Sequence, residues 1–172
     1  MKAVGIVVGI AAALAIQYTL GRFAVRGVVA IDFVLVIVVY VALTSGPTTG
    51  MLTGTVAGLI QDTLSSTNGV IGIGGLAKTI VGFFGGIIGT QFIVTQLFPR
   101  FVVFFGATLF HAALFMGLYA VLEIHDFGTR PYAAILWQAG ANAVVGVVTF
   151  QLVEFLPGAV ERRRAAKPRL RR

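Results

Sequence analysis

Three ionisable residues stand in the apolar part of this sequence, where charged side chains are uncommon. Asp32, Asp62 and Lys78 fall within or beside hydrophobic stretches. An ionised side chain at the centre of a membrane-spanning helix costs roughly 2.5–3.5 kcal/mol even on insertion scales, so all three are expected to face protein rather than lipid. Because buried ions persist when they are paired, we predict a buried charge cluster in which Asp62 pairs with Lys78, and Asp32 or Arg26 completes the network.

This charge cluster has two interpretations. The one we favour is a structural clamp that holds the third and fourth apolar segments together. The alternative is a transport or ligand-binding role, in which His111 and Asn142 would serve as relay groups. For His111, a simple hydrogen bond to a neighbouring helix is the more economical interpretation.

The sequence contains no pattern typical of a catalytic, metal-binding or cofactor-binding site. Cysteine is absent, which excludes thiolate nucleophiles and cysteine metal ligands, and the two histidines lie fourteen residues apart. Ser65 and Ser66, close to Asp62, do not fit a strand–turn–helix nucleophile pattern. We therefore expect a protein that is not an enzyme and that needs no metal and no cofactor.

Composition places the chain among membrane proteins. Of its 172 residues, 58% are hydrophobic and 11% are charged, whereas globular domains carry about 25% charged residues. We predict an all-α, polytopic transmembrane helix bundle of six spans, with five as the alternative. Residues 1–156 form this single bundle and residues 157–172 form a basic tail. The predicted spans are residues 3–20, 28–43, 50–64, 75–98, 101–122 and 132–155, with Pro99-Arg100 as a tight connection.

The basic tail predicts the orientation of the chain. The positive-inside bias keeps such a segment in the cytoplasm, although Arg22 and Arg26 then fall outside, against the rule. Directly beside a span, the tail is better interpreted as a contact with anionic lipid, worth about 1 kcal/mol per basic residue, than as a nucleic-acid site. The lipid-facing residues are Arg162, Arg163, Arg164, Lys167, Arg169, Arg171 and Arg172.

Glycines recur at helical spacing in the third and fourth spans. Gly50, Gly54 and Gly58 share one helix face with Asp62, and Gly82 and Gly86 repeat the spacing. Glycine lets helix backbones approach closely in a membrane, where burial of apolar surface gives no advantage over lipid. Such a face either packs the bundle internally, which we favour, or docks the single span of a partner protein.

A run of residues between 32 and 91 repeats the pattern of a known membrane-protein family. Its features are Asp32-Phe33 at the start of an apolar span, Gly46-Pro47, Gly50, Gly54, Gly58-Leu59, Asp62, a small-residue turn with Gly69 and Gly72, and a following span with Lys78 and Gly82. In these features the chain resembles the rod shape-determining protein MreD family. Ile31 stands where that family usually has a proline.

The resemblance implies a non-catalytic component of the bacterial inner membrane with a cytoplasmic C-terminus. Such a protein binds the bitopic protein MreC and belongs to the elongation complex, with MreB, RodZ, RodA and a class B penicillin-binding protein. Its role is to organise lateral peptidoglycan synthesis and so to maintain cell shape. The family's bundle is also similar to the substrate-binding S component of vitamin transporters of the energy-coupling-factor (ECF) type, which supplies the alternative function. An ion-coupled channel or transporter is a third possibility.

Overall fold

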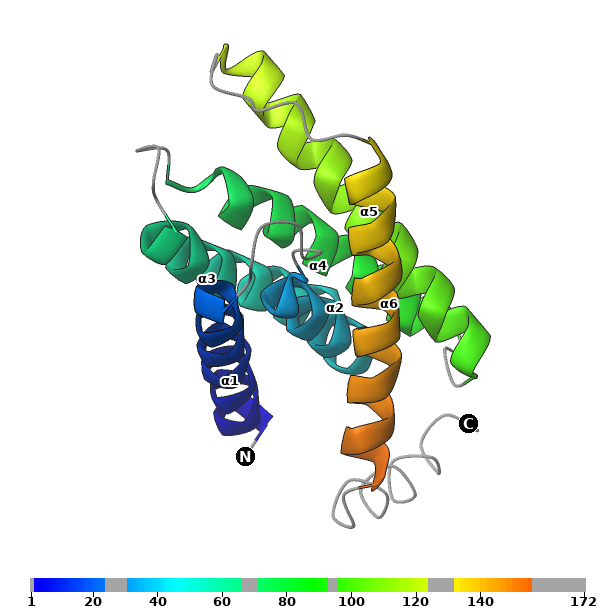
Figure 1. Ribbon diagram of the computed structural model, residues 1–172. Helices are drawn as coiled ribbons and strands as arrows, with labels where there is room; N and C mark the ends of the chain where they lie inside the picture. Colours follow the sequence, from blue (N-terminus) through cyan, green and yellow to red (C-terminus); the bar gives the residue numbers. More distant parts are fainter. Residues whose placement is uncertain (1, 24–30, 66–70, 93–95, 124–131, 156–172) are drawn as a thin grey trace.

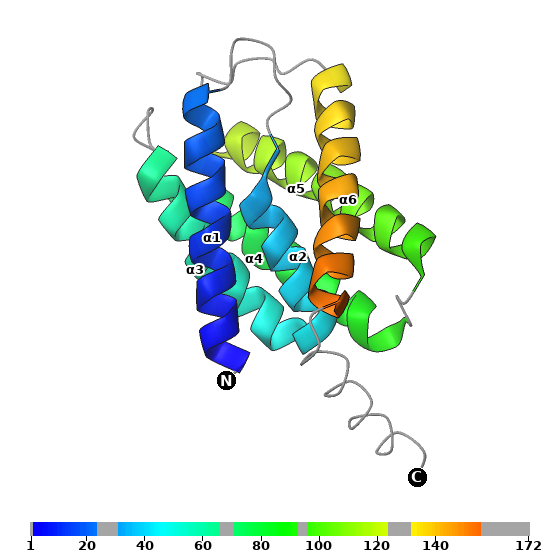
Figure 2. The same cartoon turned by 60° about the horizontal axis from the view of Figure 1, so that its bottom comes forward.

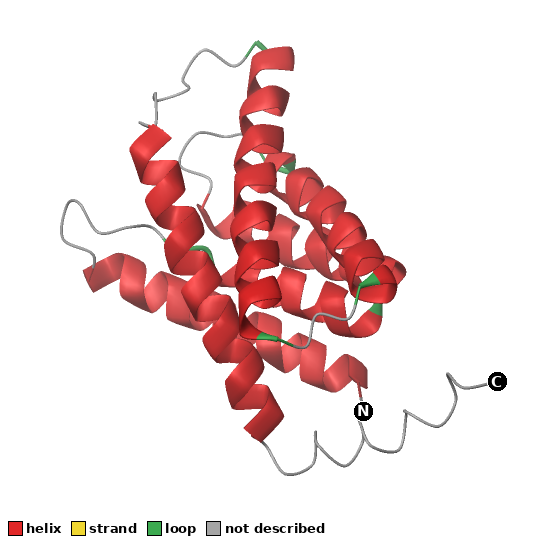
Figure 3. Cartoon of the chain, turned by 90° about the vertical axis from the view of Figure 1, so that its right-hand side faces the viewer, coloured by secondary structure: helices red, strands yellow, loops and turns green. Residues whose placement is uncertain are grey.

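The computed structural model describes residues 2–23, 31–65, 71–92, 96–123 and 132–155, and these residues form six helices with no strand among them (Figures 1 and 3). The helices are α1 (Lys2–Phe23), α2 (Phe33–Ser45), α3 (Pro47–Ser65), α4 (Ile73–Gln91), α5 (Leu97–Val121) and α6 (Tyr132–Phe155). The predicted all-α bundle is confirmed, and three of the helices, α4, α5 and α6, are long and apolar enough to cross a membrane. Arg26, the turn at 66–70 and the basic tail lie outside the described residues.

Helix α2 occupies the centre of the bundle. Seven of its thirteen residues are buried, and it contacts all five other helices. Figure 2 shows α1, α2 and α6 standing upright in front of α3, α4 and α5, which cross behind them obliquely. A helix that is covered by protein on every side has no need of a polar face, which explains the continuous apolar sequence of α2.

A tight turn connects α2 to α3. Gly46 ends α2 with a φ of 92°, a backbone conformation that glycine adopts without steric cost, and its N–H donates to the Ala42 carbonyl. Pro47 is the first residue of α3, a position that suits proline because the missing N–H would have no helical partner there. The third helix therefore begins three residues before the predicted span.

Helices α3 and α4 pack backbone against backbone through their glycines. A Cβ atom on Gly50 would collide with the Gly82 carbonyl oxygen, and one on Gly54 would collide with the Lys78 carbonyl oxygen. A Cβ on Gly58 would lie 2.5 Å from the Cα of Gly75, which is closer than real Cβ contacts. Only glycine permits this approach at three successive turns.

The other glycines of the predicted face are also covered within the chain. A Cβ on Gly82 would meet the Gly50 carbonyl, and one on Gly86 would meet the backbone at Pro47. All five predicted positions thus pack the bundle internally. They are not accessible for docking a partner's span.

The boundary between α4 and α5 differs from the prediction. Helix α4 ends at Gln91 and α5 begins at Leu97, so Pro99-Arg100 lies in the first turn of α5 and is not a connection. Proline is tolerated in the first turn because no hydrogen bond within the helix is lost there. The predicted fourth span, 75–98, is therefore wrong at its C-terminal end.

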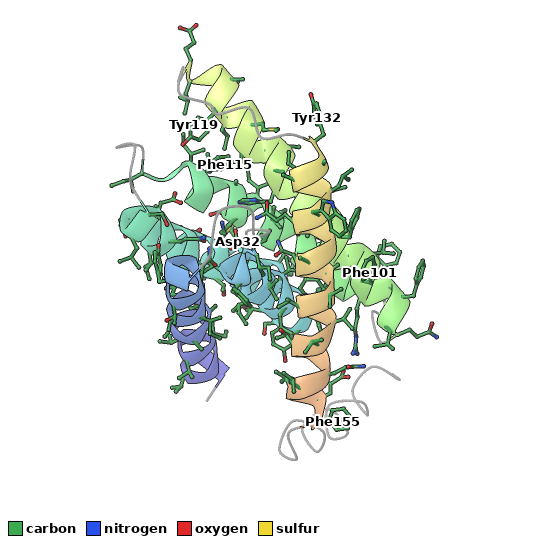
Figure 4. All side chains as sticks on the ribbon, viewed as in Figure 1. Asp32, Phe101, Phe115, Tyr119, Tyr132 and Phe155 are labelled. Carbon is green, nitrogen blue, oxygen red and sulfur yellow. The ribbon has the colours of Figure 1, made fainter. Side chains whose placement is uncertain are left out.

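Helices α5 and α6 pack through one large ring. Phe104, which is 2% exposed, lies where a side chain on Gly146 would otherwise sit. In Figure 4, Tyr132 and Phe155 mark the two ends of α6. The start of α1 and the end of α6 lie at the same end of the bundle, the lower end in Figure 1.

Candidate functional site: a buried polar network

Asp32 lies immediately before α2 and makes two kinds of bond. Its Oδ1 accepts the backbone N–H of Leu35 at 2.9 Å, which caps the helix, and its Oδ2 lies 2.8 Å from Lys78 Nζ. Both charged side chains are buried, with 10% of the Asp32 side chain and 4% of the Lys78 side chain exposed. One carboxylate therefore satisfies the first turn of α2 and neutralises a cation on α4.

Lys78 has a second partner on α5. Its Nζ lies 3.3 Å from Nε2 of His111. A lysine ammonium has donors only, so His111 Nε2 is the acceptor when the ammonium donates in this bond. The contact agrees with the prediction that His111 bonds a neighbouring helix.

Asn142 on α6 extends the network through its amide. The backbone N–H of Asp32 donates to Asn142 Oδ1 at 3.0 Å, and Asn142 Nδ2 donates to Thr108 Oγ1 at 3.2 Å. The Thr108 hydroxyl in turn donates to the Phe104 carbonyl, four residues earlier on α5. Asn142 and Thr108 are both buried, so each of these bonds satisfies a group that lipid could not.

The network lies near the middle of the longest apolar helices. Asn142 is ten residues from the start of α6 and thirteen from its end, which is about 15 Å and 20 Å at 1.5 Å per residue. In Figure 4, Asp32 lies in the interior, between the levels of Tyr132 and Phe155. The charges are therefore far from either end of a helix long enough to span a hydrocarbon core of roughly 30 Å.

Asp62 does not belong to this network, and the predicted Asp62–Lys78 pair is wrong. Asp62 Oδ2 accepts the backbone N–H groups of Gly72 and Gly75, each at 3.0 Å. These groups belong to the first turn of α4, where N–H donors lack helical partners and a negative charge complements the helix dipole. Asp62 therefore caps the next helix, while Lys78 pairs with Asp32.

Gln61, the residue before Asp62, connects the network to α1 and α3. Its Nε2 lies 3.5 Å from Asp32 Oδ1, and its backbone carbonyl accepts the Tyr18 hydroxyl at 3.1 Å. Gln61 Oε1 is the one buried side-chain polar atom of the described part of the chain without a hydrogen-bond partner. Neither Gln61 nor Thr108 was singled out by the sequence analysis, because uncharged polar residues are common in membrane helices.

A second ion pair, between a buried arginine and a partly exposed glutamate, lies between the start of α5 and the end of α6. Arg100 donates to both oxygens of Glu154, at 2.9 Å and 2.7 Å, and its guanidinium lies over the Phe150 ring, 4.6 Å from the centroid. This pair was not predicted from the sequence. A signal was present, because the six-span topology places Arg100 and the end of the last span on the same side of the membrane.

The network can hold helices together, and it can exchange a proton. The network joins α2, α3, α4, α5 and α6 at one level through the bonds described above. Lys78 and His111 are the one pair in it that could share a proton between two nitrogens. Among the residues that the structure describes, no group of three histidine, aspartate or glutamate side chains could hold a metal ion.

Comparisons with models of protein families, with curated proteins and with solved structures give no match to this chain.

Proposed function

We propose that this protein is a non-catalytic component of the bacterial inner membrane, of the MreD type, that binds MreC within the elongation complex. In this role it organises lateral peptidoglycan synthesis and so maintains cell shape. MreB, RodZ, RodA and a class B penicillin-binding protein are its further partners in the same complex.

The observation that carries the proposal is that the residues of the resemblance form one interlocking unit. Asp32 pairs with Lys78, and Asp62 caps the start of α4 at Gly72. Gly50, Gly54, Gly58 and Gly82 make the contact between α3 and α4, and Gly46-Pro47 makes the turn before it. If the resemblance came from glycine content alone, the matching residues would not be expected to contact one another.

The bonds that three carboxylates make support a scaffold rather than an enzyme. The carboxylates of Asp32, Asp62 and Glu154 bond a lysine, two backbone N–H groups and an arginine, respectively. A group that is fully engaged in this way holds helices together, and it would have to break a structural bond in order to act on a substrate.

The placement of the chain ends supports the proposed topology. The start of α1 and the end of α6 lie at the same end of the bundle (Figure 1), as six crossings require. With the basic tail in the cytoplasm, where it would contact anionic lipid, both ends are cytoplasmic. A thiol reporter at Ala165 in this cysteine-free chain should therefore resist impermeant reagents in sealed cells. Labelling from outside would contradict this orientation.

Two measurements test the function. The tagged protein, purified from its native membrane, should retain MreC in a fixed ratio, and depletion of the protein should convert rod-shaped cells to round ones. The matched control is the same purification with an unrelated tagged membrane protein of similar size. Retention of a vitamin in place of MreC, with normal cell shape after depletion, would overturn the proposal in favour of a transporter S component.

A further inference from the structure

We propose that the bilayer is thinner beside α3 than beside α6, because the polar end of α3 lies at a depth where α6 is still apolar. Phospholipid head groups then reach Thr63 and Ser65 on the side of the membrane where α6 begins, and this flank of the bundle binds phospholipids with short acyl chains. The inference goes beyond the proposed function, and it does not depend on MreC or on any other protein partner.

The polar network places four helices at a common level. Gln61 of α3 bonds Asp32 at the start of α2, and the Asp32 N–H donates to Asn142 of α6. Gln17 of α1 accepts the backbone N–H of Val34, in the first turn of α2. Because hydrogen bonds join these residues, they lie within reach of one another's side chains, and we call their depth in the bundle the network level.

The helices extend unequally from the network level toward the side where α6 begins. Helix α6 has ten residues there, 132–141, which span about 15 Å. Helix α3 has four, 62–65, and because it crosses α6 obliquely they rise by at most about 6 Å (Figure 2). In Figure 1 the start of α6 accordingly stands higher than the end of α3. On the opposite side the two helices are alike, with fourteen residues in α3 (47–60) and thirteen in α6 (143–155).

The end of α3 is polar, whereas α6 is apolar beyond the same level. Asp62 is partly exposed, and Thr63 and Ser65 are exposed. The first ten residues of α6 include no charged residue, and their exposed side chains include Leu136 and Trp137. A hydrocarbon layer thick enough to cover this part of α6 would also cover the partly exposed carboxylate of Asp62, which is costly. A bilayer accommodates a short apolar segment by thinning around it, so we infer a thinner layer beside α3.

Two other arrangements of the bundle in lipid make a different prediction. In a flat bilayer centred on the network level, the end of α3 lies in hydrocarbon. In a flat bilayer whose surface coincides with the end of α3, the start of α6 stands in water. In both, an outer position on α6 is closer to water than the end of α3 is. Local thinning reverses this order.

Spin labels on single cysteines measure the order directly, because the native chain has no cysteine. Leu64→Cys on α3 and Leu136→Cys on α6 replace side chains of similar exposure, 58% and 53%. The first lies three residues beyond Gln61 and the second six residues beyond Asn142, about 4.5 Å and 9 Å along their helices. In nanodiscs of dioleoyl phosphatidylcholine, collisions of each label with a water-soluble nickel complex, relative to collisions with oxygen, report how close it is to water.

A matched control pair lies on the opposite side of the network level. Val7→Cys on α1 and Leu152→Cys on α6 replace side chains that are each 64% exposed. Each lies ten residues from the network level, counted from Gln17 and from Asn142. The helices are alike on this side, so the two control labels should give the same ratio of nickel to oxygen collisions.

We expect a higher ratio of nickel to oxygen collisions at position 64 than at position 136, although position 136 lies further along its helix from the network level. An equal or higher ratio at position 136 would overturn the proposal. A difference between the control labels as large as that between positions 64 and 136 would show that the whole bundle is tilted, and it would overturn the proposal too.

Tryptophan fluorescence tests the preference for short acyl chains. Native Trp137 reports the lipid beside α6, and Leu64→Trp in a Trp137→Phe background reports the lipid beside α3. In vesicles that mix dimyristoleoyl and dierucoyl phosphatidylcholine, either the short-chain or the long-chain lipid is brominated to quench a tryptophan that it contacts. The ratio of short-chain to long-chain quenching should be higher at position 64 than at position 137. Equal ratios, or a higher ratio at position 137, would overturn the preference.

Discussion

Asp32 Oδ2 and Lys78 Nζ, 2.8 Å apart, form a buried ion pair that links the first turn of the central helix to α4. The pair is neutral as a unit, and the remaining oxygen of the carboxylate caps α2. Both charges are shielded from lipid by protein. Each charge makes the burial of the other possible, so we expect the bundle to need both residues in order to fold in the membrane.

The first prediction concerns removal of one partner of this pair. Lys78→Gln leaves the Asp32 carboxylate buried and uncompensated, and should lower the free energy of unfolding by roughly 3–5 kcal/mol, the usual cost for a buried pair. Asp32→Asn alone should cost a similar amount, because it leaves the ammonium unpaired. The measurement is unfolding in detergent, together with the amount of monodisperse protein recovered from membranes.

The double variant Asp32→Asn with Lys78→Gln is the control for this prediction. Asparagine caps helices about as well as aspartate, and no charge remains buried, so most of the lost stability should return. A double-mutant cycle gives the coupling directly. Additive losses would show that the two side chains do not form an energetically significant pair.

The second prediction separates the role of Asp62 from that of Asp32. Asp62 satisfies two backbone N–H groups of α4, so Asp62→Ala should cost about 1 kcal/mol, in the range of helix caps, and Asp62→Asn should cost less. The effect should be independent of Lys78, because the two residues share no bond. A strong coupling between Asp62→Asn and Lys78→Gln in unfolding experiments would contradict the geometry described here.

The wrong pairing predicted for Asp62 shows that the sequence indicates which helix faces are in contact but does not identify the partner of a charged residue. The glycine spacing predicts which faces of α3 and α4 are in contact, whereas a charged residue in an apolar segment indicates only that a partner is required. The antiparallel register of α3 against α4 determines which groups lie close to Asp62. Gly50 faces Gly82 and Gly54 faces Lys78, so each turn along α3 moves one turn back along α4. Two turns after Gly54, Asp62 has passed Lys78 and reached the first turn of α4.

The partner of Lys78 could not be found in this way. Asp32 lies on another helix, and the crossing of α2 over α4 depends on how all six helices pack. The sequence does predict the helices themselves, since proline, glycine and apolar length are local signals. It also predicts that His111 bonds a neighbouring helix. The sequence does not identify Gln61 or Thr108 as members of the buried polar network, because a neutral polar residue in an apolar helix does not by itself indicate a buried partner.

The third prediction uses the two classes of glycine in this chain. Gly54→Leu and Gly146→Leu place side chains where the Lys78 carbonyl and the Phe104 ring already lie, so each should cost at least roughly 1–3 kcal/mol and reduce folded protein. A Cβ atom on Gly106 or Gly117 would meet nothing within 4 Å, so Gly106→Leu and Gly117→Leu should leave folding unchanged. Equal losses for both classes, measured by size-exclusion chromatography of the detergent-solubilised variants, would contradict this assignment.

The fourth prediction tests the pair between Arg100 and Glu154. Arg100→Lys keeps the charge, but it loses the two-pronged hydrogen bond to the carboxylate and the planar contact with the Phe150 ring. Stability should fall by roughly 1.5–3 kcal/mol, the usual range for hydrogen bonds to charged groups. The matched control is Thr90→Ser on α4, an exposed hydroxyl whose bond is to its own helix, which should have little effect.

Because Arg100 is buried and Glu154 is partly exposed, the two partners should also differ in their response to substitution. Glu154→Gln leaves the buried Arg100 guanidinium without its counter-ion, whereas Arg100→Met leaves a carboxylate near solvent and an apolar side chain in the interior, so Glu154→Gln should cost more stability than Arg100→Met. Thermal unfolding of the two variants in the same detergent gives the comparison. A larger loss for Arg100→Met than for Glu154→Gln would show that the packing of the arginine on Phe150 matters more than the charge of the pair.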